Sequence, residues 1–154
     1  MKQYLFIICL LVLTNFTNAQ RYDLGDAFSP STSEFKLIGI SSATGVSSYK
    51  YIRPISDYMF GRKIGDIIVG VKNGRIVTTV YNMIPVKGDI GVPQTIINLI
   101  QSNLPYPLSP IGEAYGINID NTSISISRSS NSLTFGKDRI MYFSSVKRSL
   151  LLNN

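Results

Sequence analysis

Aromatic and basic side chains that could contact a partner gather in one short stretch of the sequence, residues 49–63. Tyrosine rings and arginine guanidinium groups are enriched at protein interfaces. The stretch therefore predicts a surface that binds a protein or a glycan, although most of the nine tyrosines in the chain are expected in the core or on a sheet face. The candidate binding residues are Tyr49, Tyr51, Arg53, Tyr58, Arg62 and Lys63.

A serine and a lysine with the spacing Ser-x-x-Lys stand at positions 47 and 50. This spacing is typical of penicillin-binding enzymes and serine β-lactamases, in which a helix start presents the serine and the lysine can take its proton. Here Ser47 and Lys50 lie between a predicted loop and a predicted strand, and the same spacing recurs at Ser144 and Lys147. The chain has no Lys-Thr-Gly motif. We attribute the pattern to chance in a serine-rich sequence.

Two acidic groupings are candidates for holding a calcium ion or for acid–base chemistry. One is Asp66 with Asp89, and the other is Asp120-Asn121 with Asp138. Neither has the spacing of a calcium loop, and Asp and Asn are common in tight turns without any ligand. Nothing in the sequence brings two carboxyl groups together as glycoside hydrolysis requires. We therefore expect no metal site, no cofactor and no assigned catalytic residue.

The residue types that are missing restrict the chemistry further. The chain has no histidine and no tryptophan, and its only cysteine is Cys9. The absence of histidine excludes Ser-His-Asp and Cys-His hydrolase sites, and also haem held by histidine. A zinc site built on His and Cys is excluded in the same way. Any catalysis would depend on carboxylates, Lys, Tyr or Ser, which favours a non-enzyme.

The charge of the chain is basic but dispersed. There are 15 Lys and Arg residues against 9 Asp and Glu residues, a formal net charge of +6. The only adjacent basic pairs are Arg62-Lys63 and Lys147-Arg148, whereas a nucleic-acid binder is expected to cluster its basic residues on a stripe or patch. We expect no nucleic-acid partner. The alternative is a weak attraction to anionic glycans or lipid headgroups.

The first 19 residues predict a cleavable secretory signal peptide. Lys2 precedes an apolar run at 4–13, and Thr17 and Ala19 supply small side chains for cleavage before Gln20. The run is about half the ~20 residues of a membrane-spanning helix, so we expect no transmembrane segment in the mature chain. We expect export to the periplasm or the medium. The predicted organisation is a signal peptide at 1–19, an extended leader at 20–34 and one domain at 35–154.

The clearest local pattern is a β-hairpin within residues 67–84, closed at Asn73-Gly74. This dipeptide accepts the positive φ angles of a two-residue type I′ turn. Because side chains alternate between the two faces of a strand, the turn predicts the pairs Val71–Ile76, Val69–Thr78 and Ile67–Val80. The face opposite to these apolar residues is predicted to carry Gly70, Lys72, Arg75, Thr79 and Tyr81.

Other patterns complete the predicted fold. We expect further strands at 35–40, 49–53, 114–119, 122–128, 133–135 and 139–143. Residues 93–104 predict a helix, because Pro93 suits a first turn and Ile96, Ile100 and Leu104 recur at helical spacing. The predicted class is α+β: a twisted antiparallel sheet of about six or seven strands with this single helix packed on one face.

Residues 62–77 resemble part of a PDZ domain. The resemblance rests on Gly65-Asp66 with the aliphatic residues after it, on Asn73-Gly74, and on the later helix at 93–104. It implies a peptide-binding domain, with residues 37–40 the nearest candidate for that family's carboxylate-binding loop. The long strand predicted at 75–84 departs from the family pattern.

Four functions are compatible with these observations. The leading hypothesis is an exported, non-catalytic domain that binds another protein or an envelope component. The alternatives are a PDZ-like peptide-binding domain, a purely structural surface protein, and a small hydrolase-like enzyme that uses Asp, Glu, Lys or Tyr without His or Cys. A cleft lined by two carboxylates would favour the enzyme, whereas a sheet face with exposed Tyr and Arg would favour the binding domain.

Overall fold

The structure is a computed structural model that describes residues 22–84, 86, 92–102, 104–112, 114–119, 122–128 and 141–147. The predicted signal peptide, the predicted strand at 133–135 and the candidate acidic pair Asp120-Asn121 lie outside these residues. So do Asp89 and Asp138.

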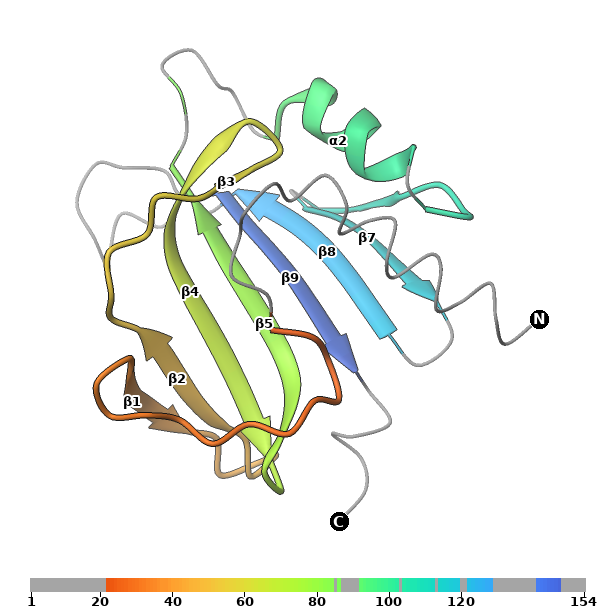
Figure 1. Cartoon of the computed structure of the whole chain (residues 1–154). Helices are drawn as coiled ribbons and strands as arrows, with labels where there is room; N and C mark the ends of the chain where they lie inside the picture. Colours follow the sequence, from red (N-terminus) through yellow and green to blue (C-terminus); the bar gives the residue numbers. More distant parts are fainter. Residues whose placement is uncertain are drawn as a thin grey trace.

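A single path of antiparallel strands organises the chain, with one helix (Figure 1). The first five strands are β1 (Phe35–Ile40), β2 (Ser47–Tyr51), β3 (Tyr58–Met59), β4 (Arg62–Lys72) and β5 (Arg75–Met83). The helix α2 (Gln94–Gln101) follows, and then β6 (Ser109–Ile111), β7 (Ala114–Ile119), β8 (Thr122–Arg128) and β9 (Met141–Lys147). The sheet order is β1-β2-β4-β5-β9-β8-β7-β6, and β3 pairs with β4. The predicted α+β class with a twisted antiparallel sheet is confirmed.

The two short strands β3 and β6 were not expected. They have two and three residues, too few to show an alternating pattern. β6 also contains Pro110, which lacks an N–H group and is tolerated at a sheet edge. The strands predicted at 35–40, 114–119 and 122–128 are confirmed at the same bounds.

The connection through α2 determines which strands lie at the edges. After β5 the chain passes through α2 to β6 at the far side of the sheet, and β7, β8 and β9 then return strand by strand. β9 therefore pairs with β5, and β1 and β6 become the two edge strands.

The β4–β5 hairpin closes as predicted, but its register changes near the turn. Asn73 and Gly74 have φ angles of 52° and 70°, and Val71 pairs with Ile76. A β-bulge between Gly70 and Val71 then shifts the pairing by one residue. The bulge lies where Gly70, having no side chain, lets the Thr78 methyl group close over it.

The shift corrects the predicted pairs of the hairpin. Val69 pairs with Thr79 rather than Thr78, and Ile67 pairs with Tyr81 rather than Val80. Thr79 and Tyr81 are therefore on the same face as Ile67 and Val69, not on the opposite one. Both are buried, and Tyr81 belongs to the main apolar cluster.

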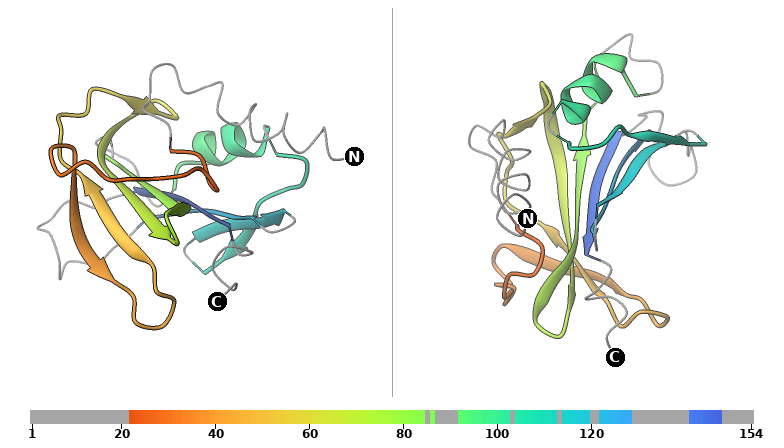
Figure 2. Two further views of the ribbon diagram at one scale, coloured as in Figure 1. Left: turned by 60° about the horizontal axis from the view of Figure 1, so that its bottom comes forward. Right: turned by 90° about the vertical axis from the view of Figure 1, so that its right-hand side faces the viewer.

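The helix and the inner face of the sheet share one core. The prediction at 93–104 is confirmed in type, with α2 starting directly after Pro93 and burying Ile96, Ile97 and Ile100. The cluster that contains these side chains also holds sheet residues, among them Ile64, Met83 and Ile126. Figure 2 shows α2 at one end of the sheet and the β1–β2 hairpin at the other.

Residues 22–34 are the described part of the predicted leader. They lie across the end of the sheet opposite to α2 (Figure 1). The N–H of Gly25 donates to the carbonyl of Ile76 at 2.8 Å, and the N–H of Ile76 donates to the carbonyl of Asp26 at 2.9 Å. Tyr22 and Phe28 of this segment pack against the core. The segment thus covers part of the inner sheet face.

Candidate functional site

The six residues proposed from sequence divide into separate groups in the structure. Tyr49 and Tyr51, on β2, are half-buried and pack against the core. The Tyr51 ring lies 5.3 Å from the Phe35 ring, and the Tyr49 ring lies 6.0 Å from the Phe28 ring, between ring centroids. These two tyrosines belong to an aromatic cluster beneath residues 22–34.

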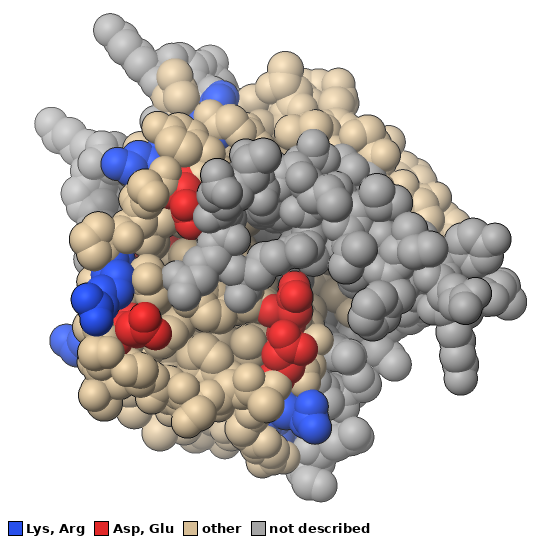
Figure 3. All heavy atoms as spheres, viewed as in Figure 1, with Lys and Arg blue, Asp and Glu red and all other residues tan. Residues whose placement is uncertain are grey.

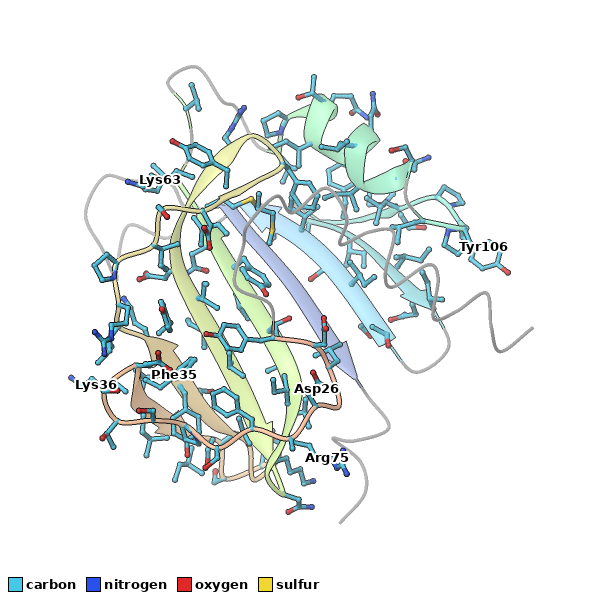
Figure 4. All side chains as sticks on the ribbon, viewed as in Figure 1. Asp26, Phe35, Lys36, Lys63, Arg75 and Tyr106 are labelled. Atoms are coloured by element: carbon cyan, nitrogen blue, oxygen red, sulfur yellow. The ribbon has the colours of Figure 1, made fainter. Side chains whose placement is uncertain are left out.

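Three of the remaining candidates come together on the β3–β4 hairpin. Tyr58 pairs with Lys63 in the register, and Met59 pairs with Arg62. Tyr58 and Lys63 are exposed. Figure 4 labels Lys63 near β3, at the end of the sheet that carries α2. Arg53 is exposed in the segment between β2 and β3.

A larger exposed feature is the outer edge of β1. β1 pairs with β2 on one side, and no described strand pairs with it on the other. In an antiparallel pair, residues that exchange hydrogen bonds with the partner strand alternate with residues whose N–H and C=O groups point away from it. The N–H of Ile52 donates to the carbonyl of Glu34 at 2.8 Å, and the N–H of Ser41 donates to the carbonyl of Val46 at 2.9 Å. Glu34 and Ser41, which flank β1, therefore both direct their backbone N–H and C=O groups toward β2.

The alternation fixes which groups point outward. Phe35 follows Glu34 and turns its N–H away from β2, toward the carbonyl of Ser31 at 2.8 Å. By the same alternation, counted from each end of the strand, Leu37 and Ile40 direct their N–H and C=O groups to the open edge. A bulge between Leu37 and Gly39 separates the two positions.

Apolar side chains accompany these outward-pointing backbone groups. Phe35 is only 7% exposed, but Leu37, Ile38 and Ile40 are 46%, 49% and 65% exposed. The difference arises because the rings of Tyr22 and Phe28 pack on Phe35, 5.5 and 4.9 Å away between centroids. We call Leu37, Ile38, Ile40 and the neighbouring exposed Ile52 the β1 edge.

Both lysine and carboxylate side chains lie beside the β1 edge, where Glu34 directly precedes β1. Lys36 lies directly opposite Lys50 in the register, and Lys50 Nζ forms an ion pair with Asp66 Oδ1 at 2.7 Å. Lys36 is exposed, and within the described part of the chain no carboxylate forms an ion pair with it. Figure 3 shows Lys and Arg side chains, with Asp and Glu side chains between them, along the side of the molecule that carries β2 and the β3–β4 hairpin. Among the described residues, Lys36 thus has no ion-pair partner.

The hairpin that carries the edge projects from the body of the domain (Figure 2). Its turn, residues 41–45, is exposed, whereas Val46 just before β2 is buried. An extended segment of another chain could therefore approach β1 without meeting the described residues of α2, at the other end of the sheet.

The Ser-x-x-Lys pattern has no catalytic geometry here. Ser47 and Lys50 both lie on strand β2, and their odd spacing places them on opposite faces of the sheet. Lys50 is held by Asp66.

Tyr22 is a titratable residue in the aromatic cluster beneath the leader segment, and its pKa is displaced. Burial raises the pKa of its phenol well above the usual value, and the nearby Tyr51, Glu34 and Tyr81 raise it further. The hydroxyl oxygen is enclosed and has no hydrogen-bond partner among the described residues. Tyr22 therefore stays protonated at neutral pH and serves in packing beneath the leader segment, rather than as a base.

Two further features bear on possible functions. The described residues contain no group of three or more His, Cys, Asp or Glu side chains placed to hold a metal ion. No helix in the described part of the chain has the length and apolarity to cross a membrane.

No family model, curated protein or solved structure matches the chain.

Sequence reasoning named residues 37–40 only as a possible PDZ-like carboxylate-binding loop and did not predict that they form an exposed sheet edge. The run 35–40 was recognised as a strand, but its exposure depends on its position at the margin of the sheet. A weak signal was available, because Leu37, Ile38 and Ile40 place apolar residues at both odd and even positions. A strand with one solvated face normally alternates apolar and polar residues.

Proposed function

We propose that this protein is an exported, non-catalytic domain that binds another protein through the β1 edge. The observation that carries the proposal is a six-residue edge strand whose outward-pointing backbone groups, at Leu37 and Ile40, lie beside exposed aliphatic side chains. Natural proteins usually protect such an edge with Pro, charge, a bulge or a covering segment. β1 has one lysine and a bulge, but it has no Pro and no described strand covers it. Partner segments commonly use an open edge to add one more strand to the sheet.

Strand addition suits the chemistry of this edge. Main-chain hydrogen bonds from a partner strand would satisfy the N–H and C=O groups of Leu37 and Ile40, and its side chains would cover apolar surface now in water. The basic and aromatic residues Tyr58, Arg62 and Lys63 lie on the β3–β4 hairpin, toward the end of the sheet that carries α2, and are not part of the β1 edge (Figure 1).

The other hypotheses have less support at this site. A PDZ-like site would use residues 37–40 as a carboxylate-binding loop, but these residues belong to strand β1. The enzyme hypothesis would draw on Lys and Asp side chains, and the Lys50–Asp66 pair already neutralises two of these groups. Binding through β1 needs only features that the described residues supply.

Site-specific photocrosslinking in the source organism tests the proposal. A photoreactive amino acid replaces Ile40 in the tagged full chain, and the crosslinked products are isolated from the envelope and the medium. The matched control replaces Ile111, which is similarly exposed but lies on the opposite edge strand, β6. We expect one stoichiometric partner from position 40 and not from position 111.

The contrary result is also clear. If the variant is folded and exported but position 40 yields no specific protein, or the same products as position 111, binding through β1 is wrong. Repeating the experiment at Leu37, on the same edge, excludes a failure that is peculiar to one position.

A further inference from the structure

We infer that the partner contributes an extended segment in which acidic residues alternate with aliphatic residues, and that this segment pairs with β1. The inference rests on the proposed function and specifies the chemistry of its ligand. Three observations carry it: the direction of the backbone groups, the faces on which the β1 side chains lie, and the lack of an ion pair to Lys36 within the described part of the chain.

The side chains of β1 present different chemistry on the two faces of the sheet. Leu37 pairs with Tyr49 and Ile40 pairs with Ser47, which in turn pairs with Val71 of the core. Leu37 and Ile40 therefore extend the core face to the edge. A strand added beside them would bury the most apolar surface if its residues on that face were aliphatic.

Lys36 lies on the opposite face, next to a second lysine. Directly opposed like charges destabilise a pair of strands, and Asp66 compensates only one of the two lysines, Lys50. A carboxylate on the added strand beside Lys36 would give each of the two lysines one acidic neighbour. Since neighbouring residues in a strand point to opposite faces, the acidic residues would alternate with the aliphatic ones.

A second copy of this chain does not supply that pattern. Strand β1 contains one lysine and no carboxylate, so pairing two β1 strands would bring no acidic side chain from within them. The opposite edge strand, β6, has the sequence Ser-Pro-Ile and likewise contains no carboxylate. The partner segment is therefore expected from a different protein.

The first experiment compares three capped, fluorescently labelled peptides for binding to the exported protein. They have the sequences Ser-Val-Glu-Val-Glu-Val-Ser, the same with Gln for Glu, and the same with Lys for Glu. We expect the Gln peptide to bind about threefold more weakly than the Glu peptide, and the Lys peptide more weakly again, as cross-strand charge pairs predict. Lys36→Glu should reverse the order of the Glu and Lys peptides.

Leu37→Pro tests the backbone part of the inference. Proline at this position removes an N–H that points to the open edge and leaves the bonds between β1 and β2 in place. We expect about tenfold weaker binding of the Glu peptide, from the loss of main-chain pairing. Ile111→Lys, on the other edge, is the control and should bind as the unmodified protein does. Circular dichroism verifies that each variant is folded.

The outcomes separate this inference from the proposed function. Equal affinity for the Glu and Gln peptides, or binding of none of them while position 40 still crosslinks to a protein, overturns the acidic pattern alone. Sequencing the crosslinked partner segment provides a second reading, because it should contain alternating acidic and aliphatic residues. If vesicles containing phosphatidylglycerol bind instead, with a loss in Lys36→Glu but none in Leu37→Pro, the ligand is an anionic surface and the inference is wrong.

Discussion

Substitution of Gly70 by alanine tests whether the bulge in the β4–β5 hairpin depends on the absence of a side chain. A Cβ at this position would collide with the Thr78 methyl group and would lie 3.0 Å from Cγ1 of Val46. Gly70 and Thr78 are register partners, so the collision is between two strands that are hydrogen-bonded to each other. Relief would require the hairpin or the Thr78 side chain to move.

The expected cost follows from two opposing effects. Overpacking a buried site costs about 1–3 kcal/mol, whereas replacing glycine by alanine gains about 0.4–1 kcal/mol by restricting the unfolded chain. Gly70→Ala should therefore lower the free energy of unfolding by about 1–2 kcal/mol. Thr78→Ser keeps the hydroxyl group and deletes the colliding methyl group, at a cost of about 0.8 kcal/mol for the lost burial.

The double variant distinguishes collision from any other cause. In Gly70→Ala with Thr78→Ser the colliding methyl group is gone. The double variant should therefore lose about 1 kcal/mol less unfolding free energy than the sum of the losses in the two single variants. Urea unfolding followed by far-ultraviolet circular dichroism measures all three variants, since the chain has no tryptophan to report by fluorescence. The matched control is Gly39→Ala on β1, where a Cβ would meet nothing within 4 Å. Strict additivity, or a Gly70→Ala variant as stable as the Gly39→Ala control, would refute the reasoning.

Three further substitutions address the core, the turn and the buried phenol. Tyr22→Phe keeps the ring contacts and removes a hydroxyl that lacks a partner, so the free energy of unfolding should rise by about 1 kcal/mol in denaturant titrations; a loss of stability would show that the hydroxyl is paired. Because burial raises the pKa of Tyr22 above 10.0, its contribution to stability is complete below about pH 10 and decreases as the pH rises further; thermal unfolding between pH 9 and 11.5 should therefore depend less on pH in Tyr22→Phe than in the unmodified protein. Ile100→Ala, on the buried face of α2 at a position 1% exposed, should cost about 2–5 kcal/mol, and a cost below about 1 kcal/mol would mean that the helix contributes little to the core. Gly74→Ala places a side chain at φ 70° and should lower the free energy of unfolding by about 1 kcal/mol. Peptide affinity should not change; calorimetry can measure both the thermal unfolding and the peptide binding of this variant.

Patterns within a few residues identified many individual elements. Alternation of apolar and polar residues identified the strands at 114–119 and 122–128, because a sheet with one solvated face requires it. The turn at Asn73-Gly74 was predictable because few dipeptides tolerate positive φ at both positions. The bulge at Gly70 was not predicted, because it depends on a contact with Thr78 across the hairpin.

The candidate residues show the same division. Tyr49 and Tyr51 were assigned to a binding surface from their neighbours in sequence, but the packing of Phe28 and Phe35 against them places both rings in the aromatic cluster. Sequence alternation shows that both residues share one face of β2. It cannot show which face residues 22–34 cover, because that depends on backbone hydrogen bonds to Ile76, far away along the chain.

The amino-acid sequence by itself determined the α+β class, the main hairpin turn, the helix and the absence of histidine chemistry, since each depends on composition or on residues close in the chain. Only the tertiary structure decided that β1 is an edge strand. That position follows from the pairing of β9 with β5, which closes the middle of the sheet with a strand about 60 residues later and leaves β1 outermost. The exposure of Leu37 and Ile40, and with it the candidate site, is a consequence of this long-range pairing.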